Sequence, residues 1–373
     1  MGHFLQPRIY WLRQPPTRGG DYKIYGYSVL RAYSPLRVKS RFVISARIAG
    51  LGDCLLSLMS AWRYAKLINR TLVIDWRQSL YLRDKNQNAF SAFFEPISAI
   101  DGVPVICDDT ISLLKFPAPV YLALEQRGKL NPFIVRHSYN RLLRKIPPMI
   151  ALRNSLLHQA QRNEVELITS ARDVPEPTVK LQGCLPAELS NPEACQTFLD
   201  HLKPRQDIQR EIDAFANAHF RGRKVIAVHV RHSNGANIID NHTPYWMNES
   251  RAISKICQAI ERVRAVLGKD AIVFLCTDSR KVLTMIECSL ANVITRKKYF
   301  RPENHGELHA YNSIFNNDGA QIGKEAVVEM FLLSQGDGLV CYPPDSYFSF
   351  YARTCRSRPS VRQVDELRLE PES

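Results

Sequence analysis

The sequence predicts an α/β protein with two sheets of parallel strands, and three observations lead to this prediction. Strand-like and helix-like segments alternate along the second half, which is the pattern of a parallel sheet covered by helices. A strand, a loop, a helix and a second strand follow one another between residues 41 and 75. The length of 373 residues suits two domains of ordinary size, and a hydrophobic content of 45% is ample for their cores.

The loop of the first unit contains two glycines directly before the helix. We expect strands at residues 41–45 and 71–75, with Gly50, Gly52 and Asp53 between the first strand and the helix. Glycine lets backbone N–H groups approach a ligand closely, and a helix N-terminus attracts anions. The same residues also suit a tight turn in which Asp53 caps the helix. A G-x-G pattern without a third glycine leaves both interpretations open.

The segment 76–100 mixes aromatic and polar side chains, Trp76 and Tyr81 among them. A long segment between regular elements is often functional, and aromatic rings beside polar groups suit sugar binding. The same aromatic residues also suit a satellite of the core. Further along we expect short strands at 103–106 and 120–122, helices within 136–170, a proline-rich passage at 173–193 and a helix at 207–220.

The second half has a more regular order of elements. Short apolar runs rich in β-branched residues predict buried strands, and apolar residues at three- and four-residue spacing predict helices. The expected order is strand 224–230, helix 249–267, strand 271–276, helix from 280, strand 292–295, helix 324–334 and strand 338–342. The expected parts are a weakly ordered extension at 1–40, an N-terminal α/β domain at 41–218, a C-terminal Rossmann-like domain at 219–356 and a disordered polar tail at 357–373.

Three strands of the second half end in polar residues, which are HVRH at 229–232, TDS at 277–279 and PPDS at 343–346. Parallel strands place these ends at one edge of the sheet, where open α/β sheets bind their ligands. The planar guanidinium of Arg231 suits a diphosphate, which it grips through two hydrogen bonds. Glu325 and Glu329 lie four positions apart on one expected helical face, and an acidic side chain there suits the N1–H and amino group of guanine. The alternative for each strand end is a solvated turn with incidental charge.

Composition and short motifs disfavour several classes of protein. The net charge of +14 predicts an anionic partner, but the basic residues are scattered and no nucleic-acid-binding motif occurs. The nine cysteines form no C-x-x-C pair, which argues against a zinc site or a disulfide framework and favours a reducing compartment. No P-loop pattern is present. No D-x-D pair occurs either, so we expect no bound metal.

The sequence also bears on location. No apolar run approaches the length of a membrane helix, and the N-terminus lacks the apolar core of a signal peptide. We therefore expect a cytoplasmic protein without an integral membrane segment. The sequence gives no prediction of the oligomeric state.

Four blocks of sequence carry a resemblance to a known family. They are SARIAGLGDCLLSLMSAWRYAKLINRTLVIDW, VIAVHVRHSNG, VFLCTDS and EMFLLSQGDGLVCYPPDSYFSFYAR. In this order they resemble the rhizobial nodulation fucosyltransferases (the NodZ family) and the wider α-1,6-fucosyltransferases of glycosyltransferase family 23. The resemblance covers residues 41–356.

The resemblance implies a GT-B fold, in which two Rossmann-like domains with parallel sheets face a cleft. The donor would be GDP-β-L-fucose, bound mainly by the second domain, with no cofactor. It implies an inverting, metal-independent transfer of L-fucose to the C6 hydroxyl of the reducing-end N-acetylglucosamine. The acceptor would be a chitooligosaccharide or lipochitooligosaccharide.

The resemblance also implies roles for single residues. Arg231 matches the arginine on the β-phosphate, His229 the histidine near the nucleoside, and Glu329 the acidic residue that reads guanine. Asp278 lies in the second motif. The remaining donor-side matches are Asp345 and Ser346 near phosphate, and Gly50 and Gly52, with Asp53 beside them, in the loop that faces the donor.

The chain departs from the wider family at two points. His232 replaces a second arginine, so that donor binding would depend more on Arg231. A lysine and a glutamate that follow the first motif in the wider family have no counterpart here. Asp240 is therefore the first candidate for the catalytic base, followed by His232 and Asp53. Trp76, Tyr81 and Trp246 are the candidates for acceptor binding. The alternatives are a fucosyltransferase with another glycan or peptide acceptor, and a non-catalytic nucleotide- or glycan-binding module.

Overall fold

The computed structural model describes two parallel-rich sheets with their covering helices. The described residues are 41–84, 86–109, 111, 120–121, 173, 177–181, 192–232, 246–300, 319–344, 346–356 and 367–368. Predictions for 1–40, for the helices within 136–170 and for most of the proline-rich passage lie outside these residues.

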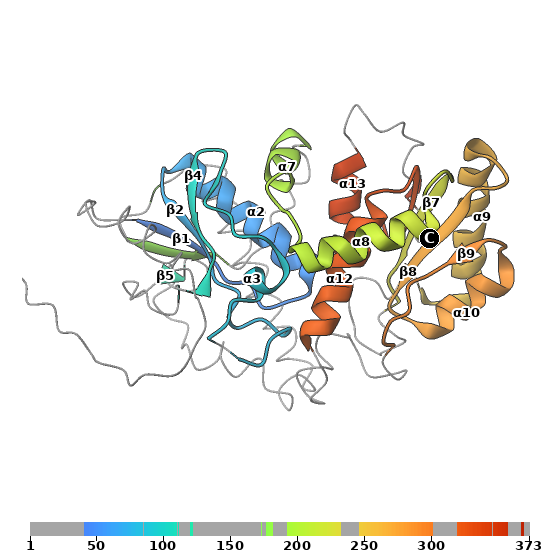
Figure 1. The fold of residues 1–373 in the computed structure, drawn as a ribbon, viewed down its shortest axis with the longest axis horizontal. Coiled ribbons are helices and arrows are strands. Elements are labelled where there is room, and N and C mark those ends of the chain that lie inside the picture. Colours follow the sequence, from blue (N-terminus) through green and yellow to red (C-terminus); the bar gives the residue numbers. More distant parts are fainter. Residues whose placement is uncertain are drawn as a thin grey trace, which may run out of the picture. The chain divides into compact units, whose positions relative to one another are not determined.

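The first sheet has the strand order β3-β4-β2-β1-β6-β5. Figure 1 labels β4, β2, β1 and β5 of this sheet. All its pairings are parallel except the antiparallel pair of β3 and β4. Its strands are β1 (Phe42–Ser45), β2 (Thr71–Ile74), β3 (Ala99–Ile100), β4 (Val103–Ile106), β5 (Val120–Tyr121) and β6 (Thr178–Leu181). Helix α2 (Leu51–Leu67) packs on one face of this sheet and buries Leu55, Leu58 and Met59. The predicted strand–loop–helix–strand unit is confirmed.

The second sheet is entirely parallel, with the order β11-β10-β7-β8-β9. Every residue of β7 and β8 is buried, as expected for central strands with helices on both faces. The strands are β7 (Val225–Val230), β8 (Ile272–Thr277), β9 (Val293–Ile294), β10 (Gly338–Tyr342) and β11 (Leu367–Arg368). All four strands predicted for the second half are confirmed.

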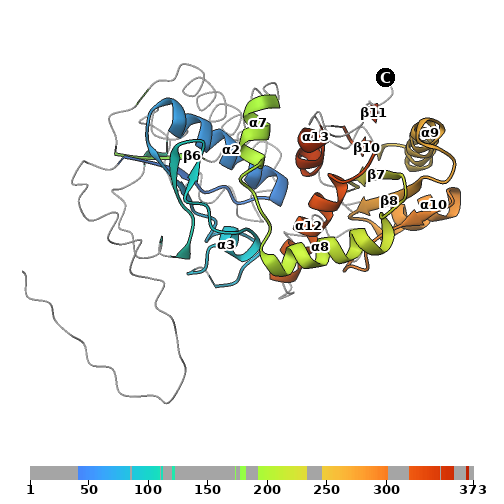
Figure 2. The ribbon, with the colours of Figure 1, turned by 45° about the horizontal axis from the view of Figure 1, so that its top comes forward.

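Helices cover both faces of the second sheet (Figure 2). One face packs against α9 (Glu249–Leu267) and α10 (Arg280–Ser289), whose apolar residues form a separate core cluster. The other face packs against α12 (Gly319–Leu333), which begins five residues before the predicted start at residue 324. The core cluster that includes α12 also includes residues of α2 and of the first sheet. Helix α12 is thus a shared element of the two halves.

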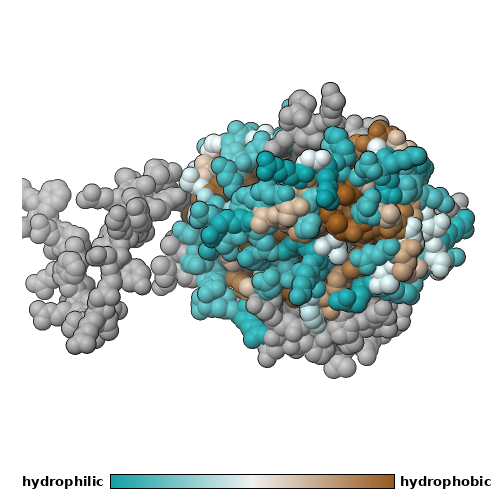
Figure 3. Space-filling model, turned by 45° about the vertical axis from the view of Figure 1, so that its right-hand side comes forward, coloured by the Kyte–Doolittle hydropathy of each residue, from teal (hydrophilic) through white to brown (hydrophobic). Residues whose placement is uncertain are grey.

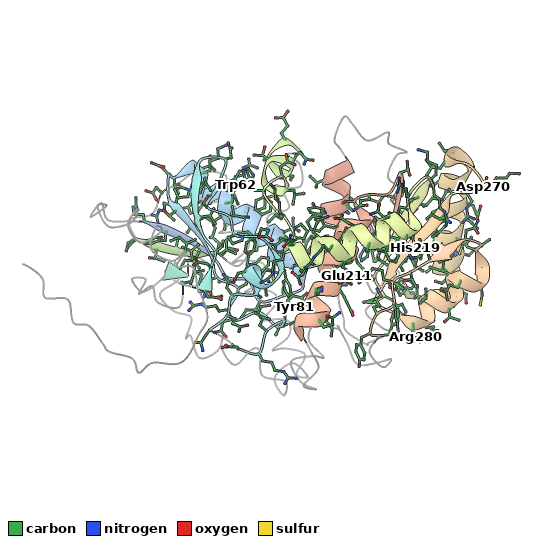
Figure 4. All side chains as sticks on the ribbon, viewed as in Figure 1. Trp62, Tyr81, Glu211, His219, Asp270 and Arg280 are labelled. Atoms are coloured by element: carbon green, nitrogen blue, oxygen red, sulfur yellow. The ribbon has the colours of Figure 1, made fainter. Side chains whose placement is uncertain are left out.

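Three further helices connect or follow these elements. Helix α8 (Gln206–His219) carries Glu211 and His219, labelled in Figure 4, and packs against α12. Helix α13 (Phe350–Arg356), near the end of the chain, packs against α7 (Pro192–Leu199). The face of the molecule drawn in Figure 3 is mainly hydrophilic. Among the described helices, none combines the length and the apolar character needed to cross a membrane.

Two expectations about irregular structure are corrected. The segment 76–100 contains the helix α3 (Ala89–Phe93). The side chain of Asn88 fixes the chain there, because it accepts from Trp76 N at 2.9 Å and donates to Ile74 O at 2.6 Å and Cys107 O at 2.8 Å. The tail that was expected to be disordered contributes β11, in which Leu367 lies opposite Val340. Both features depend on contacts between separate segments, which are side-chain hydrogen bonds in one case and a strand pairing in the other. Neither kind of contact produces a periodic pattern in the sequence.

Candidate functional site

Most of the predicted site residues gather around one cavity. It has an open volume of about 140 Å³ and is lined from the start of α2, the ends of β7 and β8, and α12. The predicted residues among its lining are Gly50, Gly52, Asp53, Tyr81, His229, Arg231, Asp278 and Glu329. A second hollow, lined by residues of α8 together with Phe331 and Tyr351, contains none of them.

The register of the second sheet explains why three motifs meet. Val230 at the end of β7 lies opposite both Tyr342 at the end of β10 and Thr277 at the end of β8. The polar residues that follow these strands therefore start at one level, as the sequence predicts. The first sheet adds the loop before α2 to the same cavity.

Arg231 is held by its backbone on two sides. Its N–H donates to Tyr342 O at 2.8 Å, and its carbonyl accepts from Trp246 Nε1 at 2.9 Å. The Trp246 ring stands edge-on to His232 and to Tyr342, with centroid distances of 4.6 and 5.1 Å. Trp246 does not line the cavity. In this structure it supports Arg231 and offers the acceptor no ring face there.

The two histidines of the motif face different surroundings. His229 lines the cavity and packs on Phe348, with the ring centroids 4.9 Å apart. His232 is 6% exposed and points to Glu249, whose Oε1 lies 3.1 Å from its Nε2. The N–H of His232 donates to Asp278 Oδ1 at 2.8 Å. His232 does not line the cavity, and its polar contacts link β7 to α9 and to the turn after β8.

Glu249 is held by two side chains from other elements. Lys281 and His232 both contact its carboxylate. The hydrogen bond from Lys281 lowers the pKa of Glu249, partial burial opposes the shift, and the hydrogen bond from His232 adds to it. No local sequence pattern predicts this pair of contacts, because the three residues come from separate elements.

Glu329 lies at the cavity as predicted, and it is not alone. Lys298 Nζ lies 2.6 Å from Glu329 Oε1, and both side chains are nearly buried. Cys276, at the end of β8, lies beside them. Burial raises the pKa of its thiol well above the usual range, and the charge of Glu329 adds to the shift. No sequence pattern places Lys298 at the site, because it lies in the loop after β9, 31 positions from Glu329.

The start of α2 is organised by contacts within the chain. Leu51 N donates to the Tyr81 hydroxyl at 2.9 Å, and Arg47 Nη2 lies 3.1 Å from Asp53 Oδ1. Gly50 is the N-cap residue of α2 and has no side chain, so Asp53 lies in the first turn and does not occupy the cap position. The Tyr81 hydroxyl therefore accepts a hydrogen bond from one of the helix N–H groups that were expected to face an anion.

The glycines of this region allow close contact between the two halves. A Cβ on Gly52 would lie 2.6 Å from the Tyr347 carbonyl carbon and oxygen, which belong to the short 3-10 helix η6 (Tyr347–Ser349). A Cβ on Gly319 would lie 2.6 Å from Tyr81 O. Figure 4 labels Tyr81, in the loop that meets the start of α12. Close packing of the backbone accounts for Gly52 without a ligand.

The remaining predicted residues lie elsewhere. Trp76 is 2% exposed and packs edge-on against Phe90 and Phe94, at centroid distances of 5.4 and 6.5 Å. Its ring faces belong to the core, so we do not place it at an acceptor site. Ser346 is 1% exposed and does not line the cavity. Asp240 and Asp345 lie outside the described residues.

Within the residues that the structure describes, no group of three or more His, Cys, Asp or Glu side chains is arranged to hold a metal ion. Among the described cysteines, Cys54, Cys107, Cys257, Cys276 and Cys288 form no disulfide.

The two parallel-rich sheets and the cavity lined from both halves define an α/β protein of the GT-B type. Comparison with known proteins then gives the family. The model of the family "Nodulation protein Z (NodZ)" matches residues 39–366. The chain belongs to the Nodulation protein Z family.

Named relatives support this assignment. Nodulation protein Z of Sinorhizobium fredii is 38% identical over 328 residues, which cover 87% of this chain and 94% of that protein. The Bradyrhizobium diazoefficiens protein of the same name is 38% identical over 314 residues, covering 84% of this chain and 78% of that protein. A crystal structure of NodZ α-1,6-fucosyltransferase co-crystallised with GDP has a TM-score of 0.65 at 33% identity, covering 84% of this chain and 92% of that chain. The structure soaked with GDP-fucose has a TM-score of 0.63 at 33% identity, covering 85% and 92%.

Proposed function

We propose that the protein is a GDP-fucose-dependent α-1,6-fucosyltransferase. The reaction is an inverting, metal-independent transfer of L-fucose from GDP-β-L-fucose. The acceptor is the C6 hydroxyl of the reducing-end N-acetylglucosamine of a chitooligosaccharide. Family membership supports the activity, since similar solved structures are described as α-1,6-fucosyltransferases with GDP or GDP-fucose.

One observation carries the proposal. A single cavity is lined by Arg231, His229 and Asp278 from strand ends and by Glu329 from α12. The guanidinium of Arg231 suits the diphosphate of the donor, and the carboxylate of Glu329 suits the N–H donors of guanine. A nucleoside diphosphate needs both kinds of partner at opposite ends.

The chemistry follows from these groups. The acceptor C6 oxygen attacks C1 of fucose from the face opposite GDP, and the C1–oxygen bond to the β-phosphate breaks. The electron pair of that bond stays on the diphosphate, where the charge of Arg231 stabilises it. The proton of the C6 hydroxyl passes to a base. Inversion at C1 converts the β-linked donor into an α-linked product.

Asp240 remains our first candidate for the base. Of the two other candidates, His232 is turned toward Glu249, and Asp53 is paired with Arg47. A general base must reach the proton that it removes, within a hydrogen-bond distance. These contacts make His232 and Asp53 less suitable than an aspartate in the segment that follows Arg231.

Metal independence is proposed because the sequence lacks the D-x-D pair with which many sugar transferases hold their ion. In its place, a cationic side chain and backbone dipoles stabilise the leaving diphosphate. The α2 N-terminus contributes to that dipole field, although Tyr81 already occupies the Leu51 N–H.

A transfer assay tests the proposal directly. The protein is incubated in EDTA with GDP-fucose and N-acetylchitooligosaccharides of different length, with and without an acyl chain. We expect a product with one added deoxyhexose, and NMR of that product shows an α-linkage to C6 of the reducing-end sugar. Acceptors reduced at that end serve as the control and are expected to react poorly.

Other outcomes separate the alternatives. Transfer only to a different glycan or to a peptide contradicts the acceptor and keeps the donor. Saturable GDP binding without transfer to any acceptor indicates a non-catalytic binding module. Activity that disappears in EDTA and returns with a divalent cation contradicts metal independence.

A further inference from the structure

The feature that goes beyond this proposal is an ion pair in the wall of the cavity. Lys298 and Glu329 both line the cavity, and their side chains are 8% and 9% exposed. Lys298 Nζ lies 2.6 Å from Glu329 Oε1. The two residues lie 31 positions apart, in the loop after β9 and on α12.

Lys298 is held in place from its own side. Its Nζ lies 5.4 Å from the centroid of the Phe300 ring, and the Arg280 guanidinium lies 4.8 Å from the same ring. Arg296, two residues earlier, is buried, contacts Glu211 on α8 and donates to the backbone oxygen of Glu325 at 3.5 Å. The segment that carries Lys298 is therefore anchored to α8 and to α12, the helix of Glu329.

The pair leaves one carboxylate oxygen for another partner. Lys298 contacts Oε1, and no donor to Oε2 occurs among the residues that the structure describes. A buried charge is tolerated when it is paired and hydrogen-bonded, and it is costly when it is not. A ligand with N–H groups at its edge completes the set.

We propose that Lys298 is the positioning residue that sets base specificity at this cavity, by holding Glu329 as an ionised acceptor with Oε2 available to the guanine edge. The inference rests on the proposed function, because it assumes that GDP is the nucleotide bound. Guanine presents two adjacent donors, N1–H and the 2-amino group. Adenine presents an unprotonated ring nitrogen at the N1 position, and the uracil ring is too small to reach the same place with both ends of the nucleotide bound.

Two other roles for Lys298 predict different changes in nucleotide affinity when the lysine is removed. A lysine that binds the diphosphate contributes equally to GDP, ADP and UDP. A lysine that competes with guanine for Glu329 weakens GDP binding, so that its removal strengthens it. The positioning role predicts a loss that is specific to guanine.

The test compares Lys298→Met with Lys297→Met. Both variants remove one positive charge from neighbouring positions, but Lys297 is exposed. GDP, IDP, ADP and UDP are titrated calorimetrically into each full-length variant, after circular dichroism has confirmed folding. IDP keeps N1–H and lacks the 2-amino group, so it counts the donors that Glu329 accepts.

We expect Lys298→Met to lower GDP affinity at least ~10-fold and UDP affinity less than ~3-fold, because a charge-assisted hydrogen bond is lost only for guanine. Lys298→Arg keeps the cation and is expected to retain the preference for GDP over UDP. Lys297→Met is expected to resemble the wild type.

Three results overturn the inference: an equal loss for all nucleotides, tighter GDP binding by Lys298→Met, or an unchanged preference for GDP. If the methionine variant does not fold, Lys298→Gln is used, since it removes the charge and keeps an N–H donor on a side chain that is one bond shorter. Its preference for GDP is then expected to fall, and an unchanged preference contradicts the role of the charge. Wild-type protein that does not bind GDP contradicts the proposed function as well, and this outcome is distinct from the other three.

Discussion

The backbone of Tyr347 lies so close to Gly52 that a methyl group on Gly52 would lie 2.6 Å from its carbonyl oxygen. The contact joins the first turn of α2 to the segment after β10, which come from opposite ends of the described chain. Phe348, the next residue, packs on His229 and lines the cavity. The position of one cavity wall thus depends on a glycine in the other half of the protein.

Gly52→Ala is expected to lower the free energy of unfolding by about 1–3 kcal/mol, because the added methyl overlaps backbone that cannot rotate away. Urea unfolding at neutral pH measures the change. Gly50→Ala is the comparison, since Gly50 has φ of −63° and ψ of 161°, which other residues adopt readily. Equal losses for the two variants contradict the special role of Gly52.

Gly323→Ala is expected to be destabilising for a different reason. A Cβ there would lie 2.1 Å from Phe93 Cζ, inside the contact between α12 and α3. Shortening the ring residue in the double variant Gly323→Ala/Phe93→Leu is expected to recover part of the stability, with a coupling of about 0.5–3 kcal/mol. The four unfolding measurements of the cycle give the coupling. Simple additivity argues against this packing.

Arg231→Ala is expected to lower the transfer rate by roughly 10²–10³-fold, because the leaving diphosphate loses its charge partner. Single-turnover transfer from GDP-fucose measures the effect, and an unchanged thermal melt serves as the folding control. The transfer rate of Arg231→Lys is expected to lie between those of the wild type and Arg231→Ala, since an ammonium cannot bind a diphosphate through two parallel hydrogen bonds. Wild-type turnover by a folded alanine variant removes Arg231 from the mechanism.

Glu249→Gln is expected to change the dependence of stability on acid. The hydrogen bond from Lys281 lowers the pKa of Glu249 in the folded state, although partial burial opposes the shift. The folded protein therefore holds this proton less tightly than the unfolded chain. The stabilisation is complete when the pH lies above the pKa that Glu249 has in the unfolded chain. It is lost as the pH falls through the lower pKa of the folded state.

Unfolding by urea across a pH series from ~7 to ~3 tests this expectation. The glutamine variant should be less stable than the wild type at pH ~7 and should lose less stability on acidification. Glu287→Gln, at an exposed position of α10, is the matched control. Parallel curves for the wild type and Glu249→Gln mean that the Lys281 and His232 contacts do not stabilise the folded state.

The sequence predicted strands and helices correctly where apolar residues formed a continuous run or a regular spacing. The buried runs 225–230 and 272–277 and the spacing of Ile253, Ile256 and Ile260 predicted strands and a helix that the structure confirms. The meeting of three strand ends followed from parallel pairing alone. The sequence could also predict that His229 and Arg231 would line a cavity, because they lie at the carboxyl end of a central strand.

The remaining features depend on contacts between distant segments. Trp76 is an aromatic residue among polar ones, as in many sugar-binding sites. Only the fold shows that Phe90 and Phe94 pack against its ring. The pairing of Lys298 with Glu329 needs the loop after β9 to reach α12, which no local pattern encodes. Gly52 belongs to a G-x-G pattern that also suits a ligand-binding loop. The structure explains the need for glycine at this position by the close approach of the Tyr347 backbone.

Hydrogen–deuterium exchange with and without GDP tests most directly whether this cavity is the donor site. We predict slower exchange on GDP binding in peptides that cover residues 50–54, 229–232 and 276–279, which surround the cavity. Peptides that cover residues 199–213, at the second hollow, should exchange at the same rate in both samples. Protection at the second hollow with no change around Arg231 would contradict the central claim.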